Sequence, residues 1–388
     1  MLVSRMRAFG TTVFAEMTSL AHATGAVNLG QGFPDTDGPR SMLAAAQQAI
    51  GAGVNQYPAG RGLPVLRDAI AEHRLARYGL RYDADSEVLV TVGATEAIAA
   101  TMLALCEPGD EVVVFEPYYD SYAAVIALAG AVRRPVTLRP ASAEGRFAFD
   151  PADLRAAVGP RTKLVLVNSP HNPTGTVFTR AELECVAEVC RDRDLLAVTD
   201  EVYEHLVFDG AEHVPLATLP GMRERTVSIS SAGKTFSVTG WKIGWLCAPA
   251  ALVTAVTTVK QFLTFTHSGP FQVAVAHALA GELAWVASLR SSLQARRDRL
   301  ADGLRAAGFG VHPSEGTYFL QADIRPLGLS DGVAFARSLP HERGVVVIPT
   351  AVFYDSPARG LPFVRFAFCK RDEVLDEALR RLAAPGAP

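Results

Sequence analysis

The chain has 388 residues, of which 49% are hydrophobic and 20% are charged, and its formal net charge is −3 at pH 7. This composition is ordinary for a globular protein, and the length suggests two or three domains with a large core. No long block of like charge is present, so nothing in the sequence calls for nucleic acid or an anionic membrane as a partner.

Short apolar runs alternate with helical patterns through the middle of the chain. Strands are predicted at residues 87–93, 111–117, 163–168, 195–203, 226–231 and 242–249. Several of these runs are apolar on both faces, as expected for a sheet that helices cover on both sides. Between them, Asp150 before Pro151 and the capping box of Thr179 and Glu182 each predict the start of a helix. The pattern predicts an α/β fold with a mostly parallel, doubly wound sheet.

The last third of the chain has a different pattern. A long amphipathic helix is predicted at residues 287–308, and mixed strands and helices follow, with strands within 316–324 and 363–370. This part therefore predicts a separate and smaller α+β domain.

The cysteines and histidines indicate neither a disulfide framework nor a metal site. The chain has five dispersed cysteines, no CxxC pair and no HExxH motif. An odd, scattered set of cysteines is typical of a reducing compartment, so we expect a cytoplasmic protein without a metal. The N-terminus lacks the continuous apolar segment of a secretory signal, and the longest apolar runs, such as 97–106, are too short to cross a bilayer.

The stretch SISSAGKTFSVTGWKIGW (residues 228–245) raises the question of what Lys234 does. A P-loop would need a glycine where Ser228 stands, and a helix that opens at the lysine. A serine acylase of the penicillin-binding kind would need S-D-N and K-T-G elements, which the chain lacks. Two readings of Lys234 remain. It is either a solvent-exposed lysine or the lysine that forms a Schiff base with a carbonyl cofactor.

Three predicted strands end in side chains that a pyridoxal 5′-phosphate (PLP) site requires. The cofactor needs a lysine for its aldehyde, a carboxylate for its ring nitrogen and donors for its phenolic oxygen. Asn172 follows the strand at 163–168, the next strand ends with Asp200 and Tyr203, and Lys234 follows the third. Ligands in open α/β sheets bind beyond the carboxyl ends of strands, so these side chains are expected to converge.

These residues belong to an ordered set of motifs that resembles the PLP-dependent aminotransferases of fold type I, class I/II. The resemblance is nearest to the branch of kynurenine, glutamine/methionine and N-succinyldiaminopimelate aminotransferases. The matching strings are NLGQGFPD (28–35), NQYPAGRG (55–62), TVGATEA (91–97), EPYYDSY (116–122), NSPHNPTG (168–175), DEVYEHLVF (200–208), SSAGKTFSVTGWKIGW (230–245) and VRFAFCK (364–370).

The resemblance implies a division of the chain into domains. Residues 1–40 form an N-terminal segment that joins the small domain. Residues 41–280 form the large PLP-binding domain, and residues 281–388 form the small α+β domain.

The resemblance also implies a role for each residue near the cofactor ring. Lys234 is expected to form the Schiff base and to move the proton, and burial beside a cationic cofactor would lower its pKa. Asp200 is expected to pair with the pyridinium nitrogen. Asn172 and Tyr203 are expected to donate to the phenolic oxygen, and Tyr119 is expected to stack on the ring.

A second group of residues is expected to hold the cofactor phosphate. The segment Gly93, Ala94 and Thr95 opens a helix, whose free N–H groups and positive dipole end suit an anion. The resemblance adds Ser231 and Lys242 from the same subunit. It also implies that Tyr57 reaches the phosphate of the neighbouring subunit, so that the active unit is a homodimer with shared sites.

The resemblance makes Arg365 the expected ligand of the substrate α-carboxylate. It interrupts the apolar strand FVRFAF, where an arginine is costly to bury without an anion, and its planar fork fits a carboxylate. The alternative is a structural salt bridge to an acidic residue. By resemblance, Gly32 and Asn172 complete the substrate contacts. No second cation for a distal carboxylate is evident, with Arg61 as a speculative candidate. The segment 354–362 is short compared with many relatives.

The sequence thus predicts an aminotransferase that moves an amino group between an α-amino acid and a 2-oxo acid in a ping-pong cycle. An alternative is a PLP-dependent carbon–sulfur β-lyase or other PLP chemistry on the same fold, because the first proton removal is common to them. A remote alternative is a non-catalytic PLP-binding sensor domain. Such regulators carry a DNA-binding module ahead of this domain, and the match here begins almost at residue 1.

Overall fold

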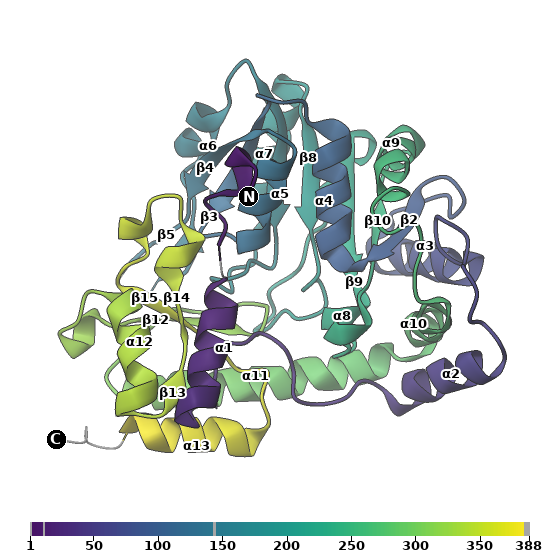
Figure 1. The fold of residues 1–388 in the computed structure, drawn as a ribbon. Helices are drawn as coiled ribbons and strands as arrows, with labels where there is room; N and C mark the ends of the chain where they lie inside the picture. Colours follow the sequence, from purple (N-terminus) through teal and green to yellow (C-terminus); the bar gives the residue numbers. More distant parts are fainter. Residues whose placement is uncertain (1, 11, 143–144, 384–388) are drawn as a thin grey trace.

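A seven-stranded sheet forms the centre of the computed structural model, which describes residues 2–10, 12–142 and 145–383 (Figure 1). The strands lie in the order β2-β10-β9-β8-β7-β3-β4. Their bounds are β2 (Val88–Val92), β3 (Glu111–Glu116), β4 (Val132–Thr137), β7 (Thr162–Asn168), β8 (Leu196–Asp200), β9 (Thr226–Ser231) and β10 (Ile243–Cys247).

The direction of these strands confirms a mostly parallel sheet. Neighbours from β9 through β8, β7 and β3 to β4 are all parallel, whereas β10 is antiparallel to both β2 and β9. The six predicted strands are all present. The edge strand β4 was not predicted, because Arg133, Arg134 and Pro135 interrupt its apolar pattern.

Helices cover both faces of the sheet because its strands are apolar on both faces. In β3, Val112 and Val114 pack on one side with α4, α5 and α9, while Val113 and Phe115 pack on the other side with α6 and α7. A third group, α2, α3 and α10, packs over β2 and β10. The bounds are α2 (Arg40–Gly51), α3 (Pro64–Tyr78), α4 (Gly93–Leu105), α5 (Asp120–Leu128), α6 (Pro151–Ala157), α7 (Arg180–Asp192), α9 (Ala250–Lys260) and α10 (Gly269–Gly281).

Both predicted helix starts are confirmed. The Asp150 side chain accepts a hydrogen bond from the Ala152 N–H at the start of α6. At the start of α7, Thr179 and Glu182 bond to each other's backbone in a full capping box. Each bond satisfies a backbone N–H that the first helical turn leaves free.

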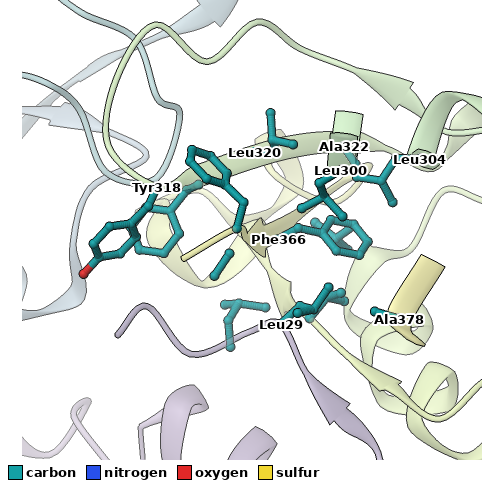
Figure 2. Close-up of a cluster of buried hydrophobic side chains, with 14 of the residues drawn as sticks. Leu29, Leu300, Leu304, Tyr318, Leu320, Ala322, Phe366 and Ala378 are labelled. Atoms are coloured by element: carbon teal, nitrogen blue, oxygen red, sulfur yellow. The ribbon is translucent and has the colours of Figure 1, made fainter. Parts of the chain in front are cut away.

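A second, smaller sheet has the order β11-β12-β15-β14 and is antiparallel. Its apolar face packs against the long helix α11 and against α12 and α13, and Figure 2 shows part of this cluster. The bounds are β11 (Gly310–Val311), β12 (Phe319–Asp323), β14 (Ile348–Pro349), β15 (Phe363–Ala367), α11 (Leu283–Ala306), α12 (Gly332–Glu342) and α13 (Asp372–Ala383).

Most of the N-terminal segment lies against this smaller sheet, whereas η1 (Ser4–Met6) contacts α5 and Phe9 packs against the core of the large sheet. Helix α1 (Val13–Thr24) contacts α12, and β1 (Val27–Asn28) pairs with β13 (Val345–Val346) (Figure 1). Helix α2, in contrast, packs on α10 over the large sheet. These contacts support, as a proposal, the division into residues 1–40, 41–280 and 281–388.

The remaining elements are short. They are α8 (Ala232–Thr235), the pair β5 (Arg139–Pro140) and β6 (Phe147–Ala148), and the 3₁₀ turns η1 (Ser4–Met6), η2 (Leu216–Thr218), η3 (Arg223–Arg225), η4 (Thr239–Trp241), η5 (Arg325–Leu327), η6 (Thr350–Phe353) and η7 (Pro357–Arg359). Within the described ranges, no helix alone is long and apolar enough to cross a membrane; α10 and α11 together pass on length and composition, with an 82° bend between them.

Candidate active site

A cavity of about 250 Å³ lies at the carboxyl ends of β7, β8 and β9, between the two sheets. Twelve of the thirteen residues predicted for the site line it, and only Tyr57 does not. The twelve are Gly32, Gly93, Ala94, Thr95, Tyr119, Asn172, Asp200, Tyr203, Ser231, Lys234, Lys242 and Arg365.

Parallel pairing brings the strand ends together. Asn168 at the end of β7 lies opposite Asp200 at the end of β8. The Asn168 side chain donates to the Asp200 backbone carbonyl (2.9 Å) and accepts from the Asn172 N–H (2.8 Å). Asn168 therefore fixes the start of the loop that carries Asn172, relative to the carboxylate of the next strand.

Lys234 lies in the four-residue helix α8, directly after β9, and its side chain is partly buried. Its Nζ donates to the hydroxyl of Tyr318 at 2.8 Å. Burial lowers the pKa of Lys234 to about 8, against the opposing effects of Cys369 and Asp200. An amine with this pKa is partly neutral at physiological pH, as a nucleophile or base requires.

Asp200 is buried and, among the described residues, has no salt-bridge partner. Burial raises its pKa to about 6, while hydrogen bonds from the Tyr122 hydroxyl (2.5 Å) and the Val202 N–H (3.3 Å) oppose that rise. A buried carboxylate in this state favours a cationic partner. A protonated pyridine nitrogen is such a partner.

The opposite end of the cavity is shaped for an anion. Gly93 begins α4 with φ +69°, and a Cβ at this position would lie 3.2 Å from the Lys242 Nζ. The Lys242 amine therefore lies beside the N-terminus of α4, and Ser231 lines the same cavity. Together with Asp200 and Lys234, this cradle fits PLP.

Arg365 is almost fully buried, at 1% exposure, and the expected alternative of a salt bridge to an acidic residue is not found among the described residues. Its guanidinium donates to Asn172 Oδ1 and to the Gly30 carbonyl, both at 2.9 Å, and lies 3.9 Å from the centre of the Phe319 ring. Its Nε has no hydrogen-bond partner, and burial lowers its pKa to about 10. An incoming carboxylate would give Nε a hydrogen-bond partner and would stabilise the buried positive charge.

Gly32 lies beside Arg365 in the same corner of the cavity. A Cβ here would lie 2.4 Å from the Phe319 ring, so only glycine allows this close approach. The Asn28 side chain accepts from the N–H groups of Gly30 and Gln31 and so fixes the loop. The Asn172 side-chain oxygen accepts from Arg365. The NH₂ group of Asn172 is therefore available to donate to a cofactor or substrate oxygen.

Three expectations concern residues outside this cavity. Tyr57 is 81% exposed and contacts the ring of Phe265. The speculative distal cation Arg61 donates instead to the backbone carbonyls of Asp85 and Ser86 and does not line the cavity. No residue of 354–362 lines the cavity either, and Asp355 accepts hydrogen bonds from Tyr118 and Arg133 instead.

Several residues at the site were not predicted from the sequence. Tyr122 and Tyr318 bind Asp200 and Lys234, and Phe14 and Phe319 line the cavity beside Arg365. Tyr122 stands three positions after Tyr119 at the start of a helix, so both can face one side; that spacing was the available signal. Nothing local marks Tyr318, whose partners are 84 and 286 residues away.

A second polar cluster lies outside the cavity. Glu201 and Glu204, which follow Asp200 and Tyr203, are buried and both bind Nη1 of Arg74, at 2.8 and 3.2 Å. Three histidines, His73, His205 and His213, surround them, and the group offers the side chains of a metal site. Because Arg74 occupies the space between the carboxylates, we interpret the cluster as an ion pair that supports the turn after β8.

Comparisons with known proteins agree with this geometry. Residues 24–382 match the family model described as aminotransferase class I and II. The chain is 58% identical to a probable N-succinyldiaminopimelate aminotransferase of Mycobacterium tuberculosis, over 99% of this chain and 98% of that protein. It is 39% identical to the methionine aminotransferase of Escherichia coli, over 98% and 97%.

Solved structures give the same result. The N-succinyldiaminopimelate aminotransferase structure from Mycobacterium tuberculosis superimposes with a TM-score of 0.97 at 57% identity, over 99% of both chains. A methionine aminotransferase structure from Escherichia coli superimposes with a TM-score of 0.94 at 38% identity, again over 99% of both.

Proposed function

This chain belongs to the class I and II aminotransferases, and from that premise we propose its amino-acid substrate and the role of each site residue. It is a PLP-dependent enzyme that moves amino groups between an α-amino acid and a 2-oxo acid. We propose that N-succinyldiaminopimelate is its amino-acid substrate. The 58% identity to the mycobacterial protein, over nearly the full length of both chains, supports this choice.

Bound PLP supplies an electron-withdrawing ring, which lets an α-amino acid release its Cα proton. Lys234 would hold the aldehyde carbon of the cofactor, Asp200 the ring nitrogen, and Asn172 and Tyr203 the phenolic oxygen. Tyr119 would cover the ring. Gly93, Ala94, Thr95, Ser231 and Lys242 would hold the phosphate. The single observation that carries this assignment is that Lys234 and Asp200 line one cavity, each with a pKa shifted toward neutrality.

Lys234 also moves the proton. Its amine, with a pKa of about 8, is basic enough to take a proton at Nζ and acidic enough to return it near neutral pH. Arg365 holds the α-carboxylate of the substrate, with support from Asn172 and Gly32, and so fixes the Cα–H bond relative to that amine.

We propose that two subunits share their sites. The exposed residues Tyr57, Phe262, Leu263 and Phe265 form an apolar patch, in which Phe262 is 84% exposed. Apolar patches of this kind mark protein interfaces. In the dimer, Tyr57 of each chain would reach the phosphate of its partner. We also propose a cytoplasmic location, which the five free cysteines support.

A panel of amino donors tests the proposed substrate. N-succinyldiaminopimelate, methionine, kynurenine and glutamine are each offered with 2-oxoglutarate, and kcat/KM is compared. We expect N-succinyldiaminopimelate to exceed the others by at least tenfold. A higher value for methionine or kynurenine would overturn the substrate but not the reaction. Pyruvate and ammonia from a cysteine conjugate, without amino transfer to any oxo acid, would favour the β-lyase alternative.

A second experiment tests the role of Lys234. Wild-type protein with PLP is expected to be yellow, and borohydride reduction followed by peptide mass analysis should locate the cofactor on Lys234. Lys234→Ala should bind PLP without a covalent link and lose transfer activity at least a thousandfold. A reduced adduct on another lysine would contradict the assignment.

A further inference from the structure

Tyr318 is a buried tyrosine whose hydroxyl group leaves the core of the small sheet. The residue comes directly before β12 and packs in the apolar cluster with Leu29, Leu320 and Phe366. In Figure 2 its hydroxyl oxygen points away from the other side chains of that cluster. A fully buried tyrosine needs a hydrogen-bond partner for its hydroxyl, so the direction of this group is informative.

Besides a hydrogen bond with the Tyr203 side chain, the hydroxyl has two partners. It donates to the Gly32 carbonyl at 2.6 Å and accepts from the Lys234 Nζ at 2.8 Å. Burial, with the neighbouring Tyr203, raises the pKa of Tyr318 well above its ordinary value, so the phenol keeps its proton at every working pH. That single proton is used by Gly32, and toward Lys234 the oxygen acts only as an acceptor.

We propose that Tyr318 is a positioning residue that holds the amine of Lys234 whenever that amine is not bonded to the cofactor. A neutral amine has two N–H bonds and one lone pair. Because Tyr318 accepts one of the N–H bonds, the direction of the lone pair is restricted, and the lone pair is the part that bonds carbon or a proton. The inference rests on the proposed role of Lys234.

The same side chain connects the amine to the carboxylate corner. Gly32 packs against Phe319 and Tyr318, and Phe319 lies under the Arg365 guanidinium. The adjacent residues Tyr318 and Phe319 therefore contact Lys234 and Arg365, respectively. One short segment thus sets the spacing between the group that takes the proton and the group that holds the carboxylate.

Capture of PLP by the apoprotein tests the proposal. Apoprotein is mixed with PLP from pH 6 to pH 10, and the rate is followed by the absorbance change of the cofactor. For wild type, the rate should rise with pH and level off above the pKa of Lys234. Hydrogen bonding to the charged amine favours the charged form, so Tyr318→Phe should move the midpoint to lower pH by about half to one unit. Its plateau rate should fall about fivefold to tenfold, because the amine is less well oriented.

Controls separate this role from a purely structural one. Tyr82→Phe removes the hydroxyl of another buried tyrosine, which has no hydrogen-bond partner among the described residues and lies outside the cavity; its midpoint should stay at the wild-type value. Tyr318→Leu removes the hydroxyl with a different shape and should shift the midpoint as Tyr318→Phe does, which keeps the test valid if the first variant does not fold.

The outcomes distinguish the two proposals. If Lys234→Ala gives the wild-type capture profile, the role of Lys234 is wrong. If Lys234→Ala abolishes covalent capture but Tyr318→Phe keeps both the wild-type midpoint and plateau, only the role of Tyr318 is overturned. In turnover, Tyr318→Phe should lower kcat about tenfold and change KM less than twofold, since the hydroxyl binds the amine and not the substrate.

Discussion

The carboxyl group of Asp200 is buried with a raised pKa. Its ionised form therefore destabilises the apoprotein but is stabilised by the cofactor in the complete enzyme. Its pKa is 3.8 in the unfolded chain and about 6 in the fold. Between these values the folded state binds more protons than the unfolded state, so stability falls as pH rises through this window. Above pH 6 the ionised carboxylate lowers the stability of the folded apoprotein. A cationic ring nitrogen beside it would offset this loss.

Asp200→Asn should therefore stabilise the apoprotein at neutral pH while it weakens the cofactor site. A shift of roughly two pH units corresponds to about 2–3 kcal/mol at pH 8, and the gain should disappear below pH 4. Urea unfolding of the two apoproteins from pH 4 to pH 8 measures this difference. PLP affinity should fall at least tenfold in the same variant. An apoprotein less stable than wild type at pH 8 would contradict the argument.

Arg365→Lys tests the carboxylate corner. Lysine retains the positive charge but not the planar fork, and it cannot bind Asn172, Gly30 and a carboxylate together. We expect KM for the amino donor to rise about thirtyfold to a hundredfold, with PLP affinity within twofold of wild type. The matched control is Arg325→Lys, because Arg325 lies near the same sheet but binds Asp323 outside the cavity. Equal KM values for the two variants would exclude the proposed contact.

At the scale of the elements, buried charges hold the turn after β8. Burial alone would raise the pKa of Glu201 and of Glu204, but Arg74 on α3 holds both below their usual values. Tyr78 and Ser230 also donate to Glu204, at 2.7 and 2.5 Å. Helix α3 thus fixes the turn that carries Asp200 and Tyr203.

Arg74→Met would leave two buried carboxylates without their cation. The loss should be about 3–5 kcal/mol in the free energy of unfolding at pH 7, measured with urea. The loss should begin to shrink above pH 4.5 and continue to shrink as pH falls, because without Arg74 burial raises the pKa of these carboxyls and they become neutral in the folded variant first. Arg77→Met, one turn along the same helix and exposed, should cost less than 1 kcal/mol. A similar loss in both variants would count against the interpretation.

The sequence predicted elements whose signal is local, and it missed contacts that depend on tertiary structure. The six strands of the large sheet were evident because each is buried on both faces. Strand β4 was missed because Arg133 and Arg134 form their ion pairs with Asp355 and Glu111 only in the folded protein. Asp200, Lys234 and Arg365 could be identified from the sequence, either by family motifs or by the cost of burying a charge. Tyr122 and Tyr318 are ordinary core residues by sequence, and only the folded chain shows which polar atoms their hydroxyl groups bind.

At the scale of the whole molecule, shared sites predict complementation between two defective chains. Lys234→Ala should be inactive, and Tyr57→Phe should bind PLP about tenfold more weakly. A hybrid dimer combines Lys234 of one chain with Tyr57 of the other, which restores one native site. Random reassembly of equal amounts should thus return about a quarter of wild-type sites with normal PLP affinity, measured by activity at limiting PLP. Activity no higher than the average of the parents would mean that Tyr57 serves its own subunit.

The corner that receives the α-carboxylate joins residues near both ends of the chain. Gly30 and Gly32 come from the first tenth of the sequence, and Arg365 from the last. During synthesis the large sheet and its lysine emerge from the ribosome long before this arginine does. Closing contacts of such sequence separation is slow, and this contact cannot form before Arg365 has been made. A newly made subunit can therefore assemble the elements of its cofactor cradle before it can discriminate amino acids, and selectivity is the final property that biosynthesis confers.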